Sequence, residues 1–150
     1  MKRQRGFTLV ELVTVLIIVG ALAVTAIASF NPALFQSRAA ADELVAALRY
    51  AQERSMTNTG APRFQIQVTG TGYSVTQNGV AITHPVTGAA AYTSSWTNIG
   101  VSPTATISFD GYGEPTLLAG AWGGNQLAFT LTVGSESSGV ALERVTGFAR

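Results

Sequence analysis

Cysteine is absent from the 150 residues, and histidine occurs once. A chain without cysteine forms no disulfide, so an exported domain of this composition must be held together by packing alone. The single histidine, His84, precedes Pro85 in a polar stretch, without a second histidine or any cysteine to share a metal. Serine and aspartate occur, but no nucleophile motif places them together. The sequence therefore predicts no enzyme, no bound metal, no cofactor and no small-molecule substrate.

Charged residues are also scarce, at 11% of the chain, and residues 7–30 contain only one, Glu11. As a helix this run is roughly 36 Å long, enough to cross a hydrocarbon core of about 30 Å. The basic residues Lys2, Arg3 and Arg5 precede the run. The positive-inside rule then places the N-terminus in the cytoplasm. We expect a single-pass helix, with everything downstream lying outside the inner face of the membrane.

Three interpretations fit such a segment: a permanent anchor, a secretory signal peptide, or a segment that is cleaved but keeps its apolar helix. Ala26-Ile27-Ala28 is an A-x-A pattern and favours the signal peptide, with a mature N-terminus at Ser29. Glu11 counts against it, because a charge inside a membrane costs a few kcal/mol and normally marks a function.

The segment Gly6-Phe7-Thr8-Leu9-Val10-Glu11-Leu12 resembles the processing site of type IV pilins and type II secretion pseudopilins. The resemblance implies that prepilin peptidase cuts between Gly6 and Phe7 and methylates the new amine of Phe7. A glycine before the cut lets the peptidase approach the backbone closely. The resemblance also implies that Glu11 pairs with the N-terminal amine of a neighbouring subunit, so other pilin or pseudopilin subunits are expected partners.

Removal of a leader at residues 1–6 changes the charge of the chain. The leader holds three of the nine basic residues, so the mature chain carries six against eight acidic ones, a balance of −2. This balance gives no general basis for binding nucleic acid, so we do not expect nucleic acid as a partner.

The next segment, residues 31–57, is predicted to continue the helix in amphipathic form. Between positions 38 and 56, mostly apolar side chains recur at three- and four-residue intervals. These are Leu44, Val45, Leu48, Ala51, Gln52 and Met56. Asp42, Glu43, Arg49 and Glu53 fall on the other side, which we expect to be mainly solvated. Asn31-Pro32 is a candidate for the point where the helix bends, or else a plain boundary.

From residue 58 the apolar period changes from helical to two, which is typical of strands. Alternation over residues 64–69 is followed by a turn at Gly70-Thr71-Gly72 and resumes at Tyr73 and Val75. With the hairpin signal Asn78-Gly79, which leads to Val80 and Ile82, it predicts a three-strand meander. Residues 84–104 are rich in Gly, Ala, Ser and Thr and indicate a loop or irregular strand. Strand patterns return at Ala105–Phe109, over 127–133, and at 140–144 after an expected turn at 134–139.

The order of one long helix followed only by strands predicts an α+β fold, pilin-like, with an antiparallel β-sheet head laid against the helix. The expected organisation is a leader at 1–6, a transmembrane and assembly helix at 7–30, an amphipathic continuation at 31–57 and a β-rich periplasmic head at 58–150.

Four features of the head region are similar to the GspH/FimT group of minor pilins and pseudopilins. They are Ala47-Leu48-Arg49-Tyr50-Ala51-Gln52, the meander, Phe109-Asp110-Gly111-x-Gly113 and Thr146-Gly147. The run Thr14-Val15-Leu16-Ile17-Ile18-Val19-Gly20 also resembles minor pilins of mannose-sensitive haemagglutinin-type pili.

Other candidate sites in the head each have two interpretations. Asp110 and Glu114 could help to hold calcium, although two carboxylates are few for six to eight oxygen ligands and a turn is favoured. Tyr92, Trp96 and Trp122 could stack on sugars, although large aromatics more often support long loops.

The C-terminal arginines are similar in position to the basic tail of DNA-binding, FimT-like pilins. Arg144 and Arg150, with Glu143 beside them, give only a weak positive patch for binding DNA.

The sequence as a whole predicts a structural subunit, a minor pilin or pseudopilin of a type IV pilus or a type II secretion pseudopilus. The alternative is a DNA- or glycan-binding tip pilin on the same scaffold.

Overall fold

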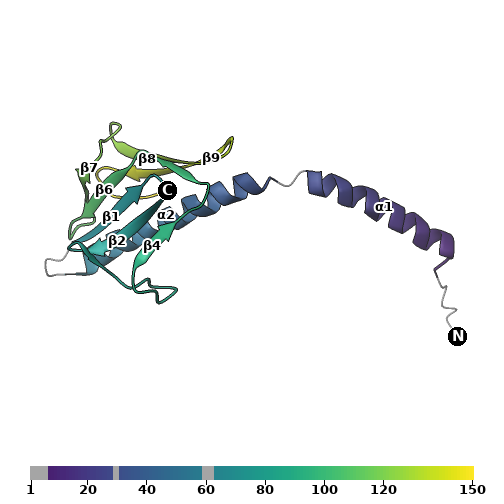
Figure 1. The fold of residues 1–150 in the computed structure, drawn as a ribbon, viewed down its shortest axis with the longest axis horizontal. Coiled ribbons are helices and arrows are strands. Elements are labelled where there is room, and N and C mark those ends of the chain that lie inside the picture. The colour runs from purple at the N-terminus through teal and green to yellow at the C-terminus, as the bar shows by residue number, and fades with distance from the viewer. Residues whose placement is uncertain (1–6, 29–30, 59–62) are drawn as a thin grey trace. The chain divides into compact units, whose positions relative to one another are not determined.

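The computed structural model describes residues 7–28, 31–58 and 63–150, so the leader residues Lys2, Arg3, Arg5 and Gly6 lie outside it. The chain divides into two compact units, Met1–Pro32 and Ala33–Arg150. Each unit is described by itself below, and Figure 1 shows the elements of both.

The first unit contains one helix, α1 (Leu9–Ala28). Its sequence is a nearly unbroken run of apolar residues, in which Glu11 is the only charge. Within the described part of the chain, no helix combines the length and the apolar character needed to cross a membrane. The helix predicted at 7–30 runs from Leu9 to Ala28 in the structure. The last two predicted positions, 29 and 30, lie outside the described residues.

The second helix, α2 (Pro32–Thr57), begins at the proline of Asn31-Pro32, the candidate bend or boundary. Proline suits a first helical position because its missing amide donor would have no partner there anyway. Small side chains form much of the buried face, which lets the helix lie close to the sheets. The buried residues are Ser37, Ala40, Ala41, Leu44, Ala47, Leu48, Ala51 and Ser55. The inclusion of Met56 in this face was wrong, since its side chain is 52% exposed at the end of the helix.

The larger sheet has six strands in the order β3-β2-β1-β6-β7, with β4 pairing with β2 along the same edge as β3. The strands are β1 (Phe64–Thr69), β2 (Gly72–Gln77), β3 (Val80–Ala81), β4 (Tyr92–Ser95), β6 (Ala105–Phe109) and β7 (Pro115–Ala119). The predicted meander β1-β2-β3 is confirmed. Asn78 and Gly79 both have positive φ, 51° and 79°, as the predicted two-residue hairpin turn requires.

The smaller sheet has the order β5-β8-β9 and is also antiparallel. Its strands are β5 (Gly100–Ser102), β8 (Gln126–Val133) and β9 (Glu136–Glu143). The expectation of one sheet was incomplete, because β5 leaves the larger sheet to pair with β8. The long turn expected at 134–139 was wrong: β9 already begins at Glu136 and follows β8 after a two-residue turn.

Side chains from α2 and both sheets form one buried cluster, with Leu44, Ile107 and Leu131 completely inaccessible to solvent. Figure 1 shows α2 running beside the strands of the head. The architecture is therefore α+β and antiparallel throughout, as the order of elements predicts.

Candidate processing and assembly site

Phe7 is the first described residue and precedes α1 without being part of it. Its side chain is 77% exposed. The predicted cut between Gly6 and Phe7 therefore involves one residue outside the described part and one that is open to an approaching enzyme. The predicted methylation of the Phe7 amine stays a prediction.

Thr8 and Glu11 together start the helix. Thr8 Oγ1 accepts a hydrogen bond of 3.3 Å from the backbone N–H of Glu11, and the Leu12 N–H donates to the Thr8 carbonyl at 3.2 Å. Thr8 is thus the N-cap and Glu11 the third helical residue, the spacing of a capping box. The N-cap role of Thr8 escaped prediction, although Thr-x-x-Glu before an apolar run is the signal for it.

The side chains of α1 that the structure describes, through Ala23, are all exposed. The polar group of Thr14 is satisfied inside the helix, because its hydroxyl donates to the Val10 carbonyl at 2.8 Å. Glu11 is exposed and, within the described residues, forms no ion pair. A helix that is apolar on every side has no polar face suited to water. Such an exposed apolar surface is typical of a site that binds partners or lipid.

Three of the sequence features noted for the head meet in space. Gln52 on α2 donates from Nε2 to the carbonyl of Gly113 at 3.0 Å and to the carbonyl of Thr146 at 2.8 Å. Gly147 has φ +66°, and a Cβ there would collide with the Gly113 carbonyl oxygen. The helix motif, the glycine loop after β6 and the C-terminal Thr-Gly are therefore one structural junction, held by the Gln52 amide.

The Asp110–Glu114 loop forms a turn, which was the favoured interpretation of these residues. Asp110 Oδ1 accepts backbone hydrogen bonds from Tyr112 at 2.9 Å and Glu114 at 2.8 Å. Across the described ranges, no group of three or more potential metal ligands is found.

Glu43 does not lie on a solvated face, contrary to expectation. Its two carboxylate oxygens accept hydrogen bonds from the Tyr73 hydroxyl at 3.1 Å and from the Trp96 indole at 2.8 Å. Burial, and then the negative charge of Glu43, raise the pKa of Tyr73, and burial raises the pKa of Tyr92. Tyr92 is buried and Trp96 half-buried, so both support the loop, which was the favoured interpretation.

The C-terminal arginines are engaged within the head. Arg150 Nη1 lies 3.9 Å from Glu143 Oε1, and the guanidinium of Arg144 lies over the Trp122 ring at 5.9 Å. Arg49 is likewise drawn toward the C-terminus, donating to the Ala149 carbonyl at 2.9 Å.

Comparison with known families gives one match. Residues 1–27 match the family model described as the prokaryotic N-terminal methylation motif. No curated protein and no solved structure matches the chain. The match covers the leader, Phe7, Glu11 and most of α1, and it supports a precursor of the type IV pilin and pseudopilin kind. Proteins with this motif are structural subunits that prepilin peptidase processes and that assemble with one another, and the α+β architecture of the chain is pilin-like.

Proposed function

We propose that the chain is the precursor of a minor pilin or pseudopilin, a structural subunit of a type IV pilus or a type II secretion pseudopilus. The observation that carries the proposal is the N-terminal methylation motif at residues 1–27, followed by a pilin-like α+β head. In this proposal prepilin peptidase cuts after Gly6 and methylates Phe7, and the chain catalyses nothing itself.

The proposal includes a stage at the inner membrane before assembly. The basic leader stays on the cytoplasmic side, the helix is held in the membrane and the head faces the periplasm. Cutting after Gly6 removes the leader and leaves the helix in place, so the subunit is stored until it enters a filament. The exposed apolar surface of α1 supports this order of events. Its apolar side chains are removed from water both in the membrane and in a filament, which is favourable in each case.

Glu11 is proposed to pair with the N-terminal amine of a neighbouring subunit during assembly. In the mature chain Phe7 would carry that amine, one helical turn before Glu11, so a small axial offset between two subunits would bring the groups together. Thr8 and Glu11 have the spacing of a capping box, so helix capping is a competing explanation for the acid, and the two can be separated by substitution.

Glu11→Gln separates them, because glutamine also serves at the third position of a capping box but carries no charge. We expect Glu11→Gln and Glu11→Ala to be cut normally, and both to reduce the amount of subunit in sheared filaments at least about tenfold. The measurement is a quantitative immunoblot of filament and membrane fractions. Glu53→Gln, at an exposed acid on α2, is the matched control and should assemble normally.

Two results would count against the pairing role. Normal assembly of Glu11→Gln, together with a defect in Glu11→Ala, would assign the acid to helix capping. Normal assembly of both variants would leave the carboxylate without either function.

A further inference from the structure

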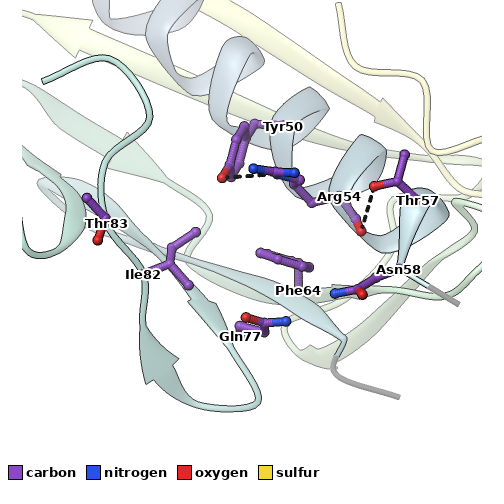
Figure 2. A pocket seen from close by; sticks show the side chains of 8 residues that line it. All are labelled: Tyr50, Arg54, Thr57, Asn58, Phe64, Gln77, Ile82 and Thr83. Carbon is purple, nitrogen blue, oxygen red and sulfur yellow. Dashed lines mark hydrogen bonds between the residues drawn. The ribbon is translucent and has the colours of Figure 1, made fainter. Parts of the chain in front are cut away.

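A cavity of about 460 Å³ opens between the C-terminal half of α2 and the β2–β3 hairpin. This volume lies within the range of small-ligand sites, about 300–1,000 Å³. Figure 2 shows the side chains that line it. They are Tyr50, Arg54, Thr57, Asn58, Phe64, Gln77, Ile82 and Thr83.

Arg54 supplies the only charge among these lining residues. Its Nε donates to the Tyr50 hydroxyl at 3.3 Å, and its guanidinium carbon lies 5.5 Å from the centre of the Tyr50 ring. Figure 2 shows the guanidinium beside the Tyr50 hydroxyl and facing the strands. Tyr50 thus holds Arg54 by one edge, and the two Nη groups form no hydrogen bond or ion pair within the described residues.

The other walls combine apolar and neutral polar surface. Tyr50 and Phe64 meet edge to face, with ring centres 6.4 Å apart and planes at 88°. Ile82 lies across from them in Figure 2. The amide of Gln77 and the hydroxyl of Thr83 also line the cavity, and neither has a partner in the part of the chain that the structure describes.

This set of groups matches a particular ligand chemistry. A guanidinium with both Nη groups free binds a carboxylate through two parallel hydrogen bonds. Free amide and hydroxyl groups suit sugar hydroxyls, and aromatic and aliphatic side chains suit the C–H faces of a sugar ring. An aromatic acid would leave the amides unused, and a single cation is a weak basis for a phosphate-rich polymer.

We propose that this cavity binds a sugar acid, a pyranose ring that carries a carboxylate, with Arg54 as the carboxylate partner. The subunit would then recognise an acidic glycan through its head. Of the candidate sugar-stacking residues, Trp96 and Trp122 do not line this cavity, while the Tyr92 ring meets the Tyr50 ring edge to face with centres 5.3 Å apart. The proposal does not rest on the processing of the N-terminus.

Titration calorimetry of the full chain in detergent micelles tests this proposal, with sodium glucuronate, glucose and inorganic phosphate as probes. We expect saturable binding of glucuronate and at least about tenfold weaker binding of glucose and phosphate. Arg54→Gln should raise the Kd for glucuronate at least about tenfold, because a charge-assisted pair is lost. Arg38→Gln, at an exposed arginine near the start of the same helix, should leave it unchanged.

Tyr50→Phe provides a second variant, which keeps the ring but frees Arg54. We expect it to weaken glucuronate binding by less than Arg54→Gln does. The proposal is overturned if the unmodified chain does not bind glucuronate, or if glucose or phosphate binds as tightly. It is also overturned if Arg54→Gln, with an unchanged circular dichroism spectrum, binds like the unmodified chain.

Discussion

Gly147 lies where conformation and space both require glycine. Its φ of +66° lies in the left-handed region, and an added Cβ would overlap the Gly113 carbonyl oxygen. Gly134, in the turn between β8 and β9, has a similar φ of +60° but open space around it. The two positions therefore separate backbone strain from steric overlap.

Gly134→Ala should lower the free energy of unfolding by about 1–2 kcal/mol, the usual cost of a left-handed conformation for a residue with a Cβ. Gly147→Ala should lower it by about 1–3 kcal/mol more, because the junction must also move apart. Urea unfolding of the two variants gives the comparison. Equal losses would show that the junction at Gly147 is looser than described.

Tyr73 makes stability depend on alkaline pH. Its pKa is raised in the folded chain, by burial and by the charge of Glu43, so the hydroxyl stays protonated while the unfolded chain begins to ionise near pH 10. Above that pH the unfolded state binds fewer protons than the folded state, and the stability falls as pH rises.

We expect Tyr73→Phe to reduce the loss of stability between about pH 9 and pH 11. It should also lower stability at pH 7 by about 1–2 kcal/mol, since Glu43 loses a hydrogen bond. Unfolding measured across this pH range provides the test. An unchanged alkaline slope would mean that Tyr73 ionises freely in the folded chain.

At the scale of elements, Gln52 connects α2 to two loops that are far apart in the sequence. Gln52→Ala leaves the carbonyls of Gly113 and Thr146 without their donor and should lower the free energy of unfolding by about 1–3 kcal/mol. Gln36→Ala, at an exposed position of the same helix, should change it by less than about 0.5 kcal/mol. Similar values for the two variants would contradict the role of Gln52.

The elements that sequence predicted well are those whose apolar residues alternate. In β8, Leu127, Phe129, Leu131 and Val133 are buried in turn, and the Asn78-Gly79 turn follows from its φ requirement. The start of β9 escaped prediction because Ser137, Ser138 and Gly139 bury little apolar surface and are held by backbone pairing with β8. Likewise, β7 and the short strands β4 and β5 depend on their neighbours more than on their own pattern.

The candidate site divides in the same way. The processing and assembly residues Gly6, Phe7 and Glu11 could be predicted from sequence because their signal is local and ordered. The Gln52 junction and the Arg54 cavity were not, since each joins residues from separate elements and exists only once the chain is folded. The hydrogen bonds to Glu43 were missed for the same reason.

At the scale of the whole molecule, the two units have different requirements. The unit Ala33–Arg150 contains the buried core and satisfies its own apolar surface. The described side chains of α1 are exposed, and in the proposed function lipid or other subunits cover them. The proposed function uses the two units differently, the helix for storage and assembly and the head for the subunit's place in a filament.

The mature N-terminus, determined by mass spectrometry of the chain produced together with prepilin peptidase, tests the account most directly. We predict a chain that begins at Phe7 and carries one methyl group on its amine. Without the peptidase, Met1 should remain. A chain that begins at Ser29, or one that retains Met1 when the peptidase is present, would contradict the account.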